Sequence, residues 1–398
     1  MSNQTHLAVG VDAGSWRTRC LICRLDGGHL RYLGHGEAVS NGWQRGRIAD
    51  QNALSARIQQ AMRGAEKMAG VAVESVVLGV GGGTVHGGNS HGIYEFGKPR
   101  AVEPEDLTYA MELASRVRLE NDRMVLQVMP QDFVVDGRAG YRKPKRMVCS
   151  RLEANVHIVT TSVQEHQCLV DAVHDAHLAV EETVLESMAA AYAAILPEDR
   201  SRGAALVDIG LHSTDLVIYD GDAMSLAASL PVAGDHFTRD IAWMLTVAYE
   251  DAERIKQEYG CALLGLTADS SYIEVPSPEN RGPREIRRRE LIEILEARAE
   301  ELFEYVRAEL VKAGMEQGLL EGVVLAGGGT NLTGMCDMAE RVLNCPARIG
   351  LPVGIDGWPV EIDSSDWTTV AGLAMYSARL KTRRDFKRRA PSLVGMLR

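Results

Sequence analysis

The chain has 398 residues, of which 45% are hydrophobic and 24% charged, a composition typical of a folded protein with a large core and more than one domain. Its formal net charge of −11 argues against general binding to nucleic acid. Because we find no run of about 18 apolar residues, and no basic region followed by an apolar run at the start, we expect neither a membrane-spanning helix nor a signal peptide.

The seven cysteines are scattered through the chain, and their number is odd. This usage indicates reduced thiols and a cytosolic compartment. Cys20 and Cys23 lie within an apolar strand pattern, and no second pair at zinc spacing accompanies them. We therefore expect them to be core residues.

The first predicted elements are a strand at residues 7–11, a loop that contains Asp12 and Gly14, and a returning strand at 18–24. A strand that ends in Asp-x-Gly makes a tight hairpin, whose backbone N–H groups can surround a phosphate while the Asp approaches the metal ion of that phosphate. A helix at 52–69 and a strand at 73–80 follow.

The segment from about 84 to 161 has the pattern of an insertion with its own small core. Apolar spacing predicts a helix at 104–117 and strands at 124–128, near 131–135 and at 154–160. A helix at 164–176, a strand at 178–185 and a helix at 188–195 come next.

The second half of the chain repeats the opening order of elements. A strand at 204–209 delivers Asp208 and then Gly210, and a strand at 215–219 returns. The repetition, which lies in topology and not in residue identity, indicates an internal duplication. Two such loops suggest two similar half-domains that hold one nucleotide from opposite sides.

The remaining elements include a third loop of interest. We expect a helix at 241–259, a turn-rich and then basic stretch at 269–289, an amphipathic helix at 289–312, and a helix at 368–380 before a basic tail. The strand that starts at Val323 runs into Gly327-Gly328-Gly329 and an apolar helical spacing. Such a strand, glycine cluster and helix N-terminus suit a purine and its α-phosphate. A tight loop without a ligand is the alternative.

This order of loops resembles the actin/Hsp70/sugar-kinase superfamily. Finer segments, at 124–136, 259–263, 273–276 and 281–284, resemble the bacterial cell-division family FtsA, and the similarity covers about residues 6–380. The resemblance implies an α/β, actin-like fold of two duplicated lobes, with an FtsA-type 1C insertion subdomain and no 1B subdomain. The implied subdomains are 1A at 1–83 and 351–380, 1C at 84–161, 2A at 162–232 and 301–350, 2B at 233–300, and a tail at 381–398.

The resemblance also implies a site for ATP and Mg²⁺, with weak or no hydrolysis. Asp12 and Asp208 would contact the metal through water. Arg17 stands where the family usually has Lys, and Glu253 and Lys256 share a helix face and match the pair that contacts ribose and base. By itself that pair would be a surface ion pair. The full set of nucleotide contacts is Asp12, Gly14, Ser15, Arg17, Asp208, Gly210, Ser213, Thr214, Glu253, Lys256, Gly327, Gly328, Gly329 and Asn331.

The second phosphate loop departs from the family pattern, because Leu211-His212-Ser213 replaces Gly-Gly-Thr. Leu and His bring Cβ atoms to a place where backbone must approach the phosphates. His212 either contacts phosphate or turns outward, and we expect the replacement to affect hydrolysis more than binding. Asp208 and Glu186 are the candidates for positioning a catalytic water.

Two basic regions match partner surfaces of the family. Arg284 and Arg298 match positions that receive the acidic C-terminal peptide of the tubulin-like FtsZ, and the alternative is a solvated helix face. From Arg379 to the end, eight Lys/Arg accompany one acid, and Pro391 interrupts the segment. We expect weak, charge-led membrane attachment, with a disordered basic tail as the alternative. The expected membrane residues are Phe386, Lys387, Arg388, Arg389, Leu393, Met396 and Leu397.

These inferences predict an ATP-binding, actin-like cell-division protein that polymerises on the cytoplasmic face of the inner membrane at the division site. It would anchor the FtsZ ring there and recruit later division proteins. One alternative is an adaptor like PilM of type IV pilus assembly, which binds a short peptide of a membrane partner. A second is an actin-fold ATPase such as a sugar kinase or a chaperone, although we find no substrate-domain signature for a kinase.

Overall fold

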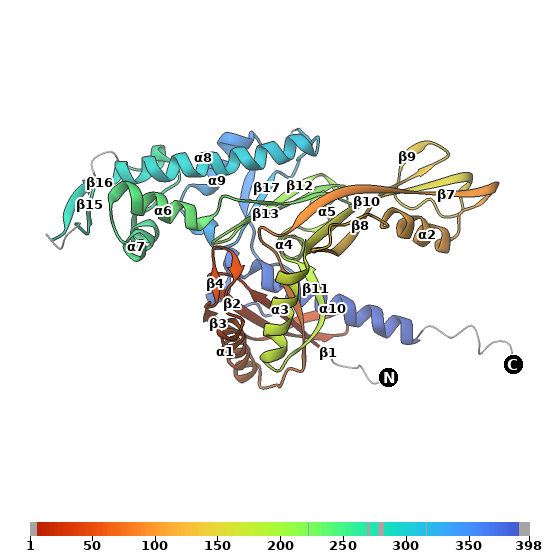
Figure 1. Ribbon diagram of the computed structural model, residues 1–398, viewed down its shortest axis with the longest axis horizontal. Coiled ribbons are helices and arrows are strands. Elements are labelled where there is room, and N and C mark those ends of the chain that lie inside the picture. The colour runs from red at the N-terminus through yellow and green to blue at the C-terminus, as the bar shows by residue number, and fades with distance from the viewer. Residues whose placement is uncertain (1–5, 222, 269–270, 278–281, 316, 390–398) are drawn as a thin grey trace. The chain divides into compact units, whose positions relative to one another are not determined.

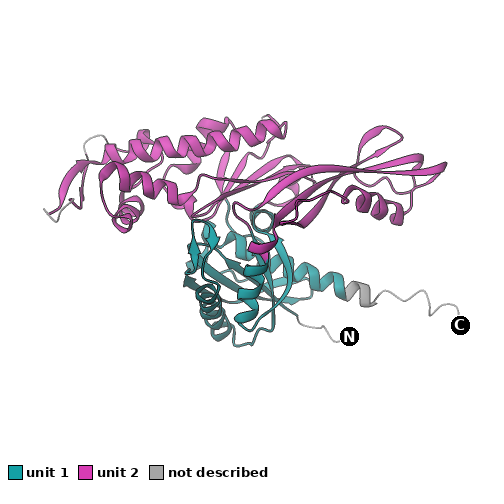
Figure 2. Cartoon of the chain, viewed as in Figure 1, with its two compact units in different colours: residues 1–80, 167–194, 350–398 teal, residues 81–166, 195–349 magenta. Residues whose placement is uncertain are grey.

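The computed structural model describes residues 6–221, 223–268, 271–277, 282–315 and 317–389, the last five by their backbone alone. The chain divides into two compact units, shown in Figure 2. Unit 1 comprises residues 1–80, 167–194 and 350–398, and unit 2 comprises residues 81–166 and 195–349. Each unit has its own sheet and its own buried apolar core.

Unit 1 is built on a five-stranded mixed sheet of order β11-β6-β1-β2-β3. The first three strands form an antiparallel meander, and β6 pairs parallel with both β1 and β11. The strands are β1 (His6–Ala13), β2 (Arg17–Asp26), β3 (His29–Val39), β6 (Ser75–Val80) and β11 (Ala179–Leu185). A short hairpin of β4 (Trp43–Gln44) and β5 (Arg47–Ile48) follows β3.

Helices pack closely on this sheet because glycines lie at the points of contact. Gly36 of β3 lies against the backbone of α1 (Gln51–Ala69), where a Cβ would come within 1.9 Å of the Ala61 carbonyl oxygen. Gly10 of β1 meets α10 (Thr368–Arg389) in a similar way. The other helical elements are α4 (Glu186–Ala194), η4 (Val360–Ile362), η5 (Ser365–Trp367) and the part of α3 (Val163–Asp175) from residue 167.

Unit 2 repeats the same arrangement of strands. Its main sheet has the order β14-β13-β12-β17-β18, with three antiparallel strands followed by two parallel ones. The sheet of unit 1 has the same arrangement when it is read from β3 to β11, because β3, β2 and β1 are antiparallel and β6 and β11 follow in parallel. The structure thus confirms the duplication that the sequence predicts. The strands are β12 (Ala204–Ile209), β13 (Thr214–Asp220), β14 (Ala223–Leu230), β17 (Val323–Ala326) and β18 (Ala347–Ile349).

The predicted insertion forms a second sheet within unit 2, of order β7-β10-β8-β9, with α2 (Pro104–Ala114) packed on it. Its long strands extend away from the main sheet, as Figure 1 shows. The bounds are β7 (His86–Ala101), β8 (Arg123–Val135), β9 (Arg138–Tyr141) and β10 (Val148–Ser162). Strand β7 is not predicted by the sequence pattern, and β8 is one strand where two are expected.

The other helices of unit 2 surround a core that includes the fully buried Phe303 of α8 (Arg288–Lys312). The prediction of a single helix at 241–259 is wrong, because this part of the chain forms two helices, α6 (Gly234–Leu245) and α7 (Tyr249–Tyr259). Thr246 ends α6 in a left-handed conformation, with φ 51°. The remaining elements are α5 (Pro197–Ser201), α9 (Met335–Leu343), η1 (Leu264–Leu266), η3 (Gly328–Asn331) and the hairpin of β15 (Tyr272–Val275) and β16 (Arg284–Arg287).

Candidate functional site

The first predicted phosphate loop is the turn between β1 and β2, in unit 1. Asp12 closes β1 opposite Arg19 of β2, and it is 9% exposed. Burial raises the pKa of the Asp12 carboxyl from 3.8 to about 6, although the nearby Arg19 and the Gly14 backbone oppose the rise. A Cβ on Gly14 would come within 2.9 Å of the Arg17 carbonyl oxygen, so the turn needs glycine there. Ser15 completes the turn and is half-buried.

Arg17 is not free in this structure, because it pairs with Glu37 on β3 at 3.1 Å. Glu37 also binds Arg19 at 2.8 Å, and Arg19 reaches Asp366 at 2.8 Å. The same side chains line a cavity of about 630 Å³ within unit 1, together with Trp16 and Trp367 among others. A phosphate would therefore meet an arginine that already has a carboxylate partner.

The second phosphate loop lies in unit 2, at the equivalent place between β12 and β13. The pairs Ala13↔Thr18 and Ile209↔Thr214 each close a hairpin with four residues between them. Gly210 N–H donates to the Ser213 carbonyl at 3.0 Å and so fixes this turn. Thr214 is fully buried and donates its hydroxyl to the Val232 carbonyl at 2.7 Å.

Asp215 lies beside this loop and receives two donors from it and its surroundings. Its Oδ2 accepts from the Gly82 N–H and from the Ser213 hydroxyl, both at 3.2 Å. Burial raises the pKa of the Asp215 carboxyl above its ordinary value, although these hydrogen bonds oppose the rise. Asp208, one strand away and directly opposite Asp215, is half-buried.

The backbone of the second loop, where Leu211 and His212 replace glycines of the family pattern, is hydrogen-bonded to the start of α6. The carbonyls of Gly210 and Leu211 accept from the N–H groups of Gly234 and Asp235, at 3.0 and 2.8 Å. His212 is half-buried, and its Nδ1 is a buried atom without a hydrogen-bond partner. Burial lowers the pKa of His212, so its imidazole is neutral near pH 7.

The glycines of the third loop have different roles. Gly327 has φ 81°, and a Cβ there would come within 2.3 Å of Asp208 Oδ1, so it permits the approach of β17 to β12. Gly329 lies equally close to the side chain of Ile209. Only Gly328 of the three is exposed, with open space where a Cβ would be. Gly328 is thus the position of this cluster most open to a ligand, and Asn331 ends η3 after it.

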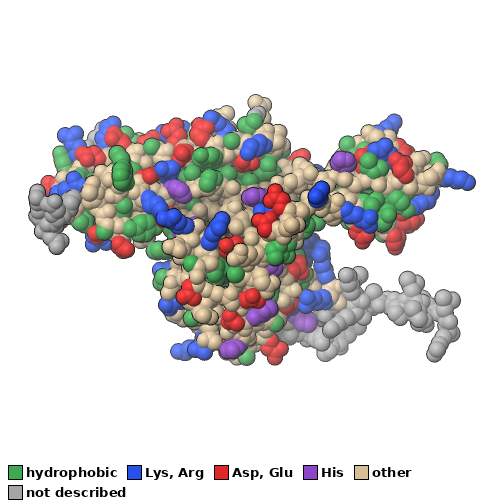
Figure 3. Space-filling model, in the orientation of Figure 1, with side chains coloured by type: hydrophobic (Ala, Val, Ile, Leu, Met, Phe, Trp, Pro, Cys, Tyr) green, Lys and Arg blue, Asp and Glu red, His purple; other side chains and the backbone are tan. Residues whose placement is uncertain are grey.

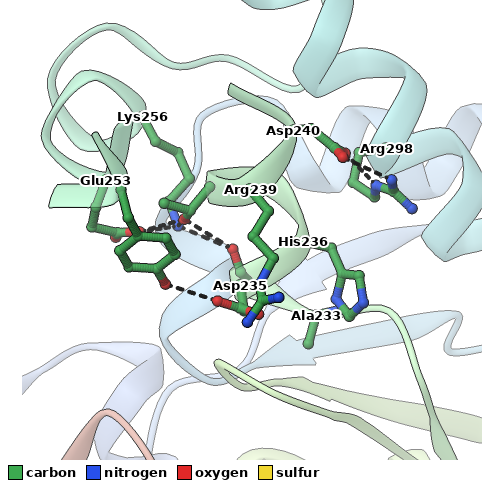
Figure 4. A network of polar contacts seen from close by, with 11 residues as sticks. Ala233, Asp235, His236, Arg239, Asp240, Glu253, Lys256 and Arg298 are labelled. Carbon is green, nitrogen blue, oxygen red and sulfur yellow. Dashed lines mark hydrogen bonds and ion pairs between the residues drawn. The ribbon is translucent and has the colours of Figure 1, made fainter. Parts of the chain in front are cut away.

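Glu253 and Lys256 form the predicted pair on one face of α7, at 2.7 Å. Sequence reasoning missed their link to α6, where Thr238 donates to Glu253 at 2.5 Å and Lys256 donates to Thr238 at 2.7 Å. Lys256 also reaches the Gly234 carbonyl at 3.2 Å. Figure 4 shows this network along the start of α6, beside the residues bound to the second phosphate loop.

The two candidate partner arginines both contact the far half of α6. Arg298 of α8 forms a two-pronged pair with Asp240, and it also binds Glu301. Arg284 is exposed and donates to the Leu245 carbonyl. These contacts bring Arg284 and Arg298 to the same half of α6, although the sequence separates them. Arg281, which belongs to the same basic stretch, lies outside the described residues.

Two large apolar side chains lie exposed on the same half of α6. Trp243 is 83% exposed and Met244 63% exposed. They follow Asp240 by three and four positions, so the three side chains share one helix face. Aromatic residues and Met are common anchors of protein interfaces, and the periodicity of α6 could have revealed them.

The first basic residues after residue 378 are bound to unit 1. Lys381 and Arg384 pair with Glu181 of β11 at 2.9 and 3.1 Å, and Arg379 donates to the Tyr192 hydroxyl at 2.5 Å. Phe386, Lys387, Arg388 and Arg389 have only their backbone described, as the end of α10, and Leu393, Met396 and Leu397 lie outside the described residues. No described helix is long and apolar enough to cross a membrane.

Comparison with known proteins agrees with this geometry. The family model for the cell division protein FtsA matches residues 205–372, and a model for the SHS2 domain inserted in FtsA matches residues 82–160. FtsA of Pseudomonas aeruginosa is 35% identical over 371 residues, which is 93% of this chain and 89% of the relative. This chain belongs to the FtsA family of cell division proteins. FtsA of Escherichia coli is 29% identical over 399 residues, covering 98% and 95% of the two chains.

Solved structures agree on the fold. The chain resembles a PilM–PilN type IV pilus biogenesis complex with a TM-score of 0.66 and 16% identity, over 93% of this chain and 98% of that one. It resembles MreB5 of Spiroplasma citri bound to ADP with a TM-score of 0.58 and 14% identity, over 95% and 98%. The actin-like fold and the FtsA-type insertion, which the sequence predicts, are thereby confirmed.

Taken separately, each loop has residues that suit part of a nucleotide and its divalent ion. Asp12 and Asp208 supply carboxylates, which are oxygen ligands suited to Mg²⁺. Gly328 has open space where a Cβ would be, so its backbone can approach a flat ligand closely. Glu186 begins α4 in unit 1, whereas Asp208 lies in unit 2. Figure 3 shows acidic and basic side chains mixed over the visible face.

Proposed function

We propose that this FtsA-family chain binds Mg-ATP, assembles into filaments on the inner face of the cytoplasmic membrane, anchors FtsZ there and recruits later division proteins. The observation that carries the proposal is the repeated Asp-x-Gly hairpin. It stands at the same place in two sheets with the same strand order. Asp12 and Asp208 end the equivalent strands, as expected of paired phosphate loops.

Nucleotide binding by both loops is supported by the chemistry of their residues. Backbone N–H groups of tight turns suit phosphate oxygens, and carboxylates suit the water shell of Mg²⁺. Glu253 and Lys256 form the predicted pair that would contact ribose and base. We expect the chain to bind ATP but to hydrolyse it slowly or not at all, since Leu211 and His212 replace two glycines of the family pattern.

Calorimetry with purified protein and Mg-ATP tests this part. We expect a saturable heat of association that falls when EDTA removes the metal. The absence of any heat at millimolar nucleotide would refute nucleotide binding. Electron microscopy on a lipid monolayer with and without ATP then tests whether assembly depends on the nucleotide.

Binding of FtsZ is supported by Arg284 and Arg298, which contact the same half of α6, and by the exposed Trp243 and Met244 beside them. Arginine forks suit carboxylates, and the aromatic side chain offers an apolar anchor. This surface would bind an acidic peptide that carries an apolar side chain.

A fluorescence anisotropy titration with the FtsZ C-terminal peptide tests this part. We expect R284A to weaken binding by about tenfold, since hydrogen bonds to charged groups contribute about 1.5–3 kcal/mol. R298A should weaken binding by a smaller factor, because Arg298 already pairs with Asp240. The matched control is R289A, because Arg289 pairs with Glu293 on the surface of α8. A peptide from a pilus-assembly partner is the competing ligand, and preference for it would favour a PilM-like adaptor.

Membrane attachment is proposed for the tail beyond the residues that unit 1 holds. Because Lys381 and Arg384 bind Glu181, the charge available to lipid begins later than the sequence suggests. Liposome flotation should compare truncation after Leu380 with truncation after Asp385. We expect both to abolish binding to anionic vesicles. Unchanged flotation of both would remove the tail from the proposal.

A further inference from the structure

The guanidinium of Arg298 is already occupied by carboxylates of its own chain. Its Nε lies 2.5 Å from Asp240 Oδ2, and its Nη2 lies 3.0 Å from Asp240 Oδ1. Its Nη1 donates to Glu301, one turn along α8. All three nitrogens therefore have partners, and the carboxylates of Asp240 and Glu301 neutralise the charge of Arg298. The side chain of Arg298 is 23% exposed.

Arg284 differs from Arg298 in what balances its charge. It donates to a neutral backbone carbonyl, that of Leu245, and no carboxylate pairs with it among the residues that the structure describes. An incoming carboxylate can therefore use Arg284 directly. To form a two-pronged pair with Arg298, the incoming carboxylate must first displace the carboxylate of Asp240, which already forms such a pair.

Asp240 is placed where such displacement is possible. Its side chain is 29% exposed, at the edge of the surface that also carries Trp243 and Met244. A peptide that covers these two apolar side chains would bring its own carboxylates next to the Asp240–Arg298 pair. Figure 4 shows the pair at the side of α6, with Asp240 pointing toward Arg298.

We infer that Asp240 is an internal competitor for the partner carboxylate at Arg298, and so sets the affinity of this surface for acidic peptides. The inference rests on the proposed peptide-binding function. In the free protein, Asp240 occupies the fork that the peptide needs. Binding exchanges one ion pair for another, and the net gain is smaller than an unpaired arginine would give. Asp240 would thereby keep the affinity moderate and suppress binding of weakly acidic sequences.

The test uses the full chain and the same FtsZ C-terminal peptide, with variants that change charge but little shape. D240N frees Arg298 from its charged partner, and we expect the peptide Kd to fall by roughly three- to tenfold at low ionic strength, as for a partly buried pair. The gain should shrink at high salt. E293Q, which removes a carboxylate paired to Arg289 on the same helix, is the matched control and should leave Kd unchanged.

A double variant assigns the gain to Arg298. If Asp240 acts through this residue, D240N should produce no gain in an R298A background. A gain that persists there would be a general charge effect and would overturn the inference. Thermal unfolding of each variant checks that it is folded. Should D240N not fold, D240S, which removes the same carboxylate with a smaller side chain, takes its place, with the same expected gain. An unchanged Kd for that variant overturns the inference.

The outcomes separate the inference from the function on which it rests. If wild type binds the peptide and R298A weakens it, but D240N leaves Kd unchanged or raises it, the peptide site stands and the competitor role fails. If neither wild type nor D240N binds the peptide, both fail. A tighter D240N with loss of the gain in R298A supports both.

Discussion

Asp12 is a buried carboxyl at the end of β1, and its replacement by Asn removes the charge while nearly preserving the shape. Burial raises the pKa of Asp12 from 3.8 to about 6. A carboxyl with a raised pKa contributes stability that is fully present below its unfolded pKa and is lost as the pH rises through about 6. Above this range, ionised Asp12 destabilises the folded state by about 3 kcal/mol relative to a neutral group.

Asn does not titrate, so D12N should gain stability over wild type as the pH rises. The gain should increase by about 2 kcal/mol between pH 4.5 and 7.5, because up to about pH 6 the carboxyl stays protonated in the folded state while it is already ionised in the unfolded state. Urea unfolding followed by circular dichroism at both pH values measures this difference. Asp26, exposed at the end of β2, provides the matched control D26N.

The same variant separates stability from function. If Asp12 contacts the metal ion of the nucleotide, D12N should bind Mg-ATP no better than metal-free ATP, although D12N is more stable than wild type at pH 7.5. Equal destabilisation of D12N at both pH values would refute the reasoning, since the contacts of Asp12 would then outweigh the cost of burying its charge.

Four other variants have outcomes that follow from the geometry. Gly327→Ala should lower the free energy of unfolding by about 2 kcal/mol or more, because Gly327 has a positive φ and lies close to Asp208. Gly328→Ala should change the free energy of unfolding little, because a Cβ at Gly328 would meet open space. Equal denaturation midpoints of the two variants would contradict these roles. E181Q should destabilise by about 1–3 kcal/mol at pH 7, since it leaves Lys381 half-buried without a charged partner. Although burial opposes the shift, hydrogen bonds from Ser75 and Lys381 and the charges of Lys381 and Arg384 lower the pKa of Glu181. The loss should therefore shrink as the pH falls, and calorimetric melting at pH 7 and pH 4 would show whether it does. His212→Gly should tighten Mg-ATP binding in calorimetry, because a side chain leaves the phosphate loop; weaker binding would mean that the imidazole contacts the nucleotide.

Elements with a strong local signal could be predicted from the sequence. The amphipathic spacing from Leu291 to Leu310 indicates a long helix, and α8 occupies almost the same residues. Strand β7 was missed because its sequence, rich in glycine and polar residues, has no alternating pattern. It is a strand because its residues, His86 to Ala101, pair with β10, which lies far away in the chain.

The candidate site shows the same division. The Asp-x-Gly turns can be recognised from spacing alone, since few residues other than glycine fit such a turn. The sequence does not reveal that Arg17 pairs with Glu37, because nothing in its spacing selects that partner. It also does not distinguish Gly328, which is open, from Gly327, which β12 requires.

The sequence by itself determined the two Asp-x-Gly turns, the duplicated order of elements, the place of the insertion and the basic character of the tail. These features depend on residues close together in the chain, where turn geometry and apolar periodicity act directly. Only the tertiary structure decided which charges neutralise each other. Arg298 and Asp240 are 58 residues apart, and they meet because α6 and α8 pack against one core.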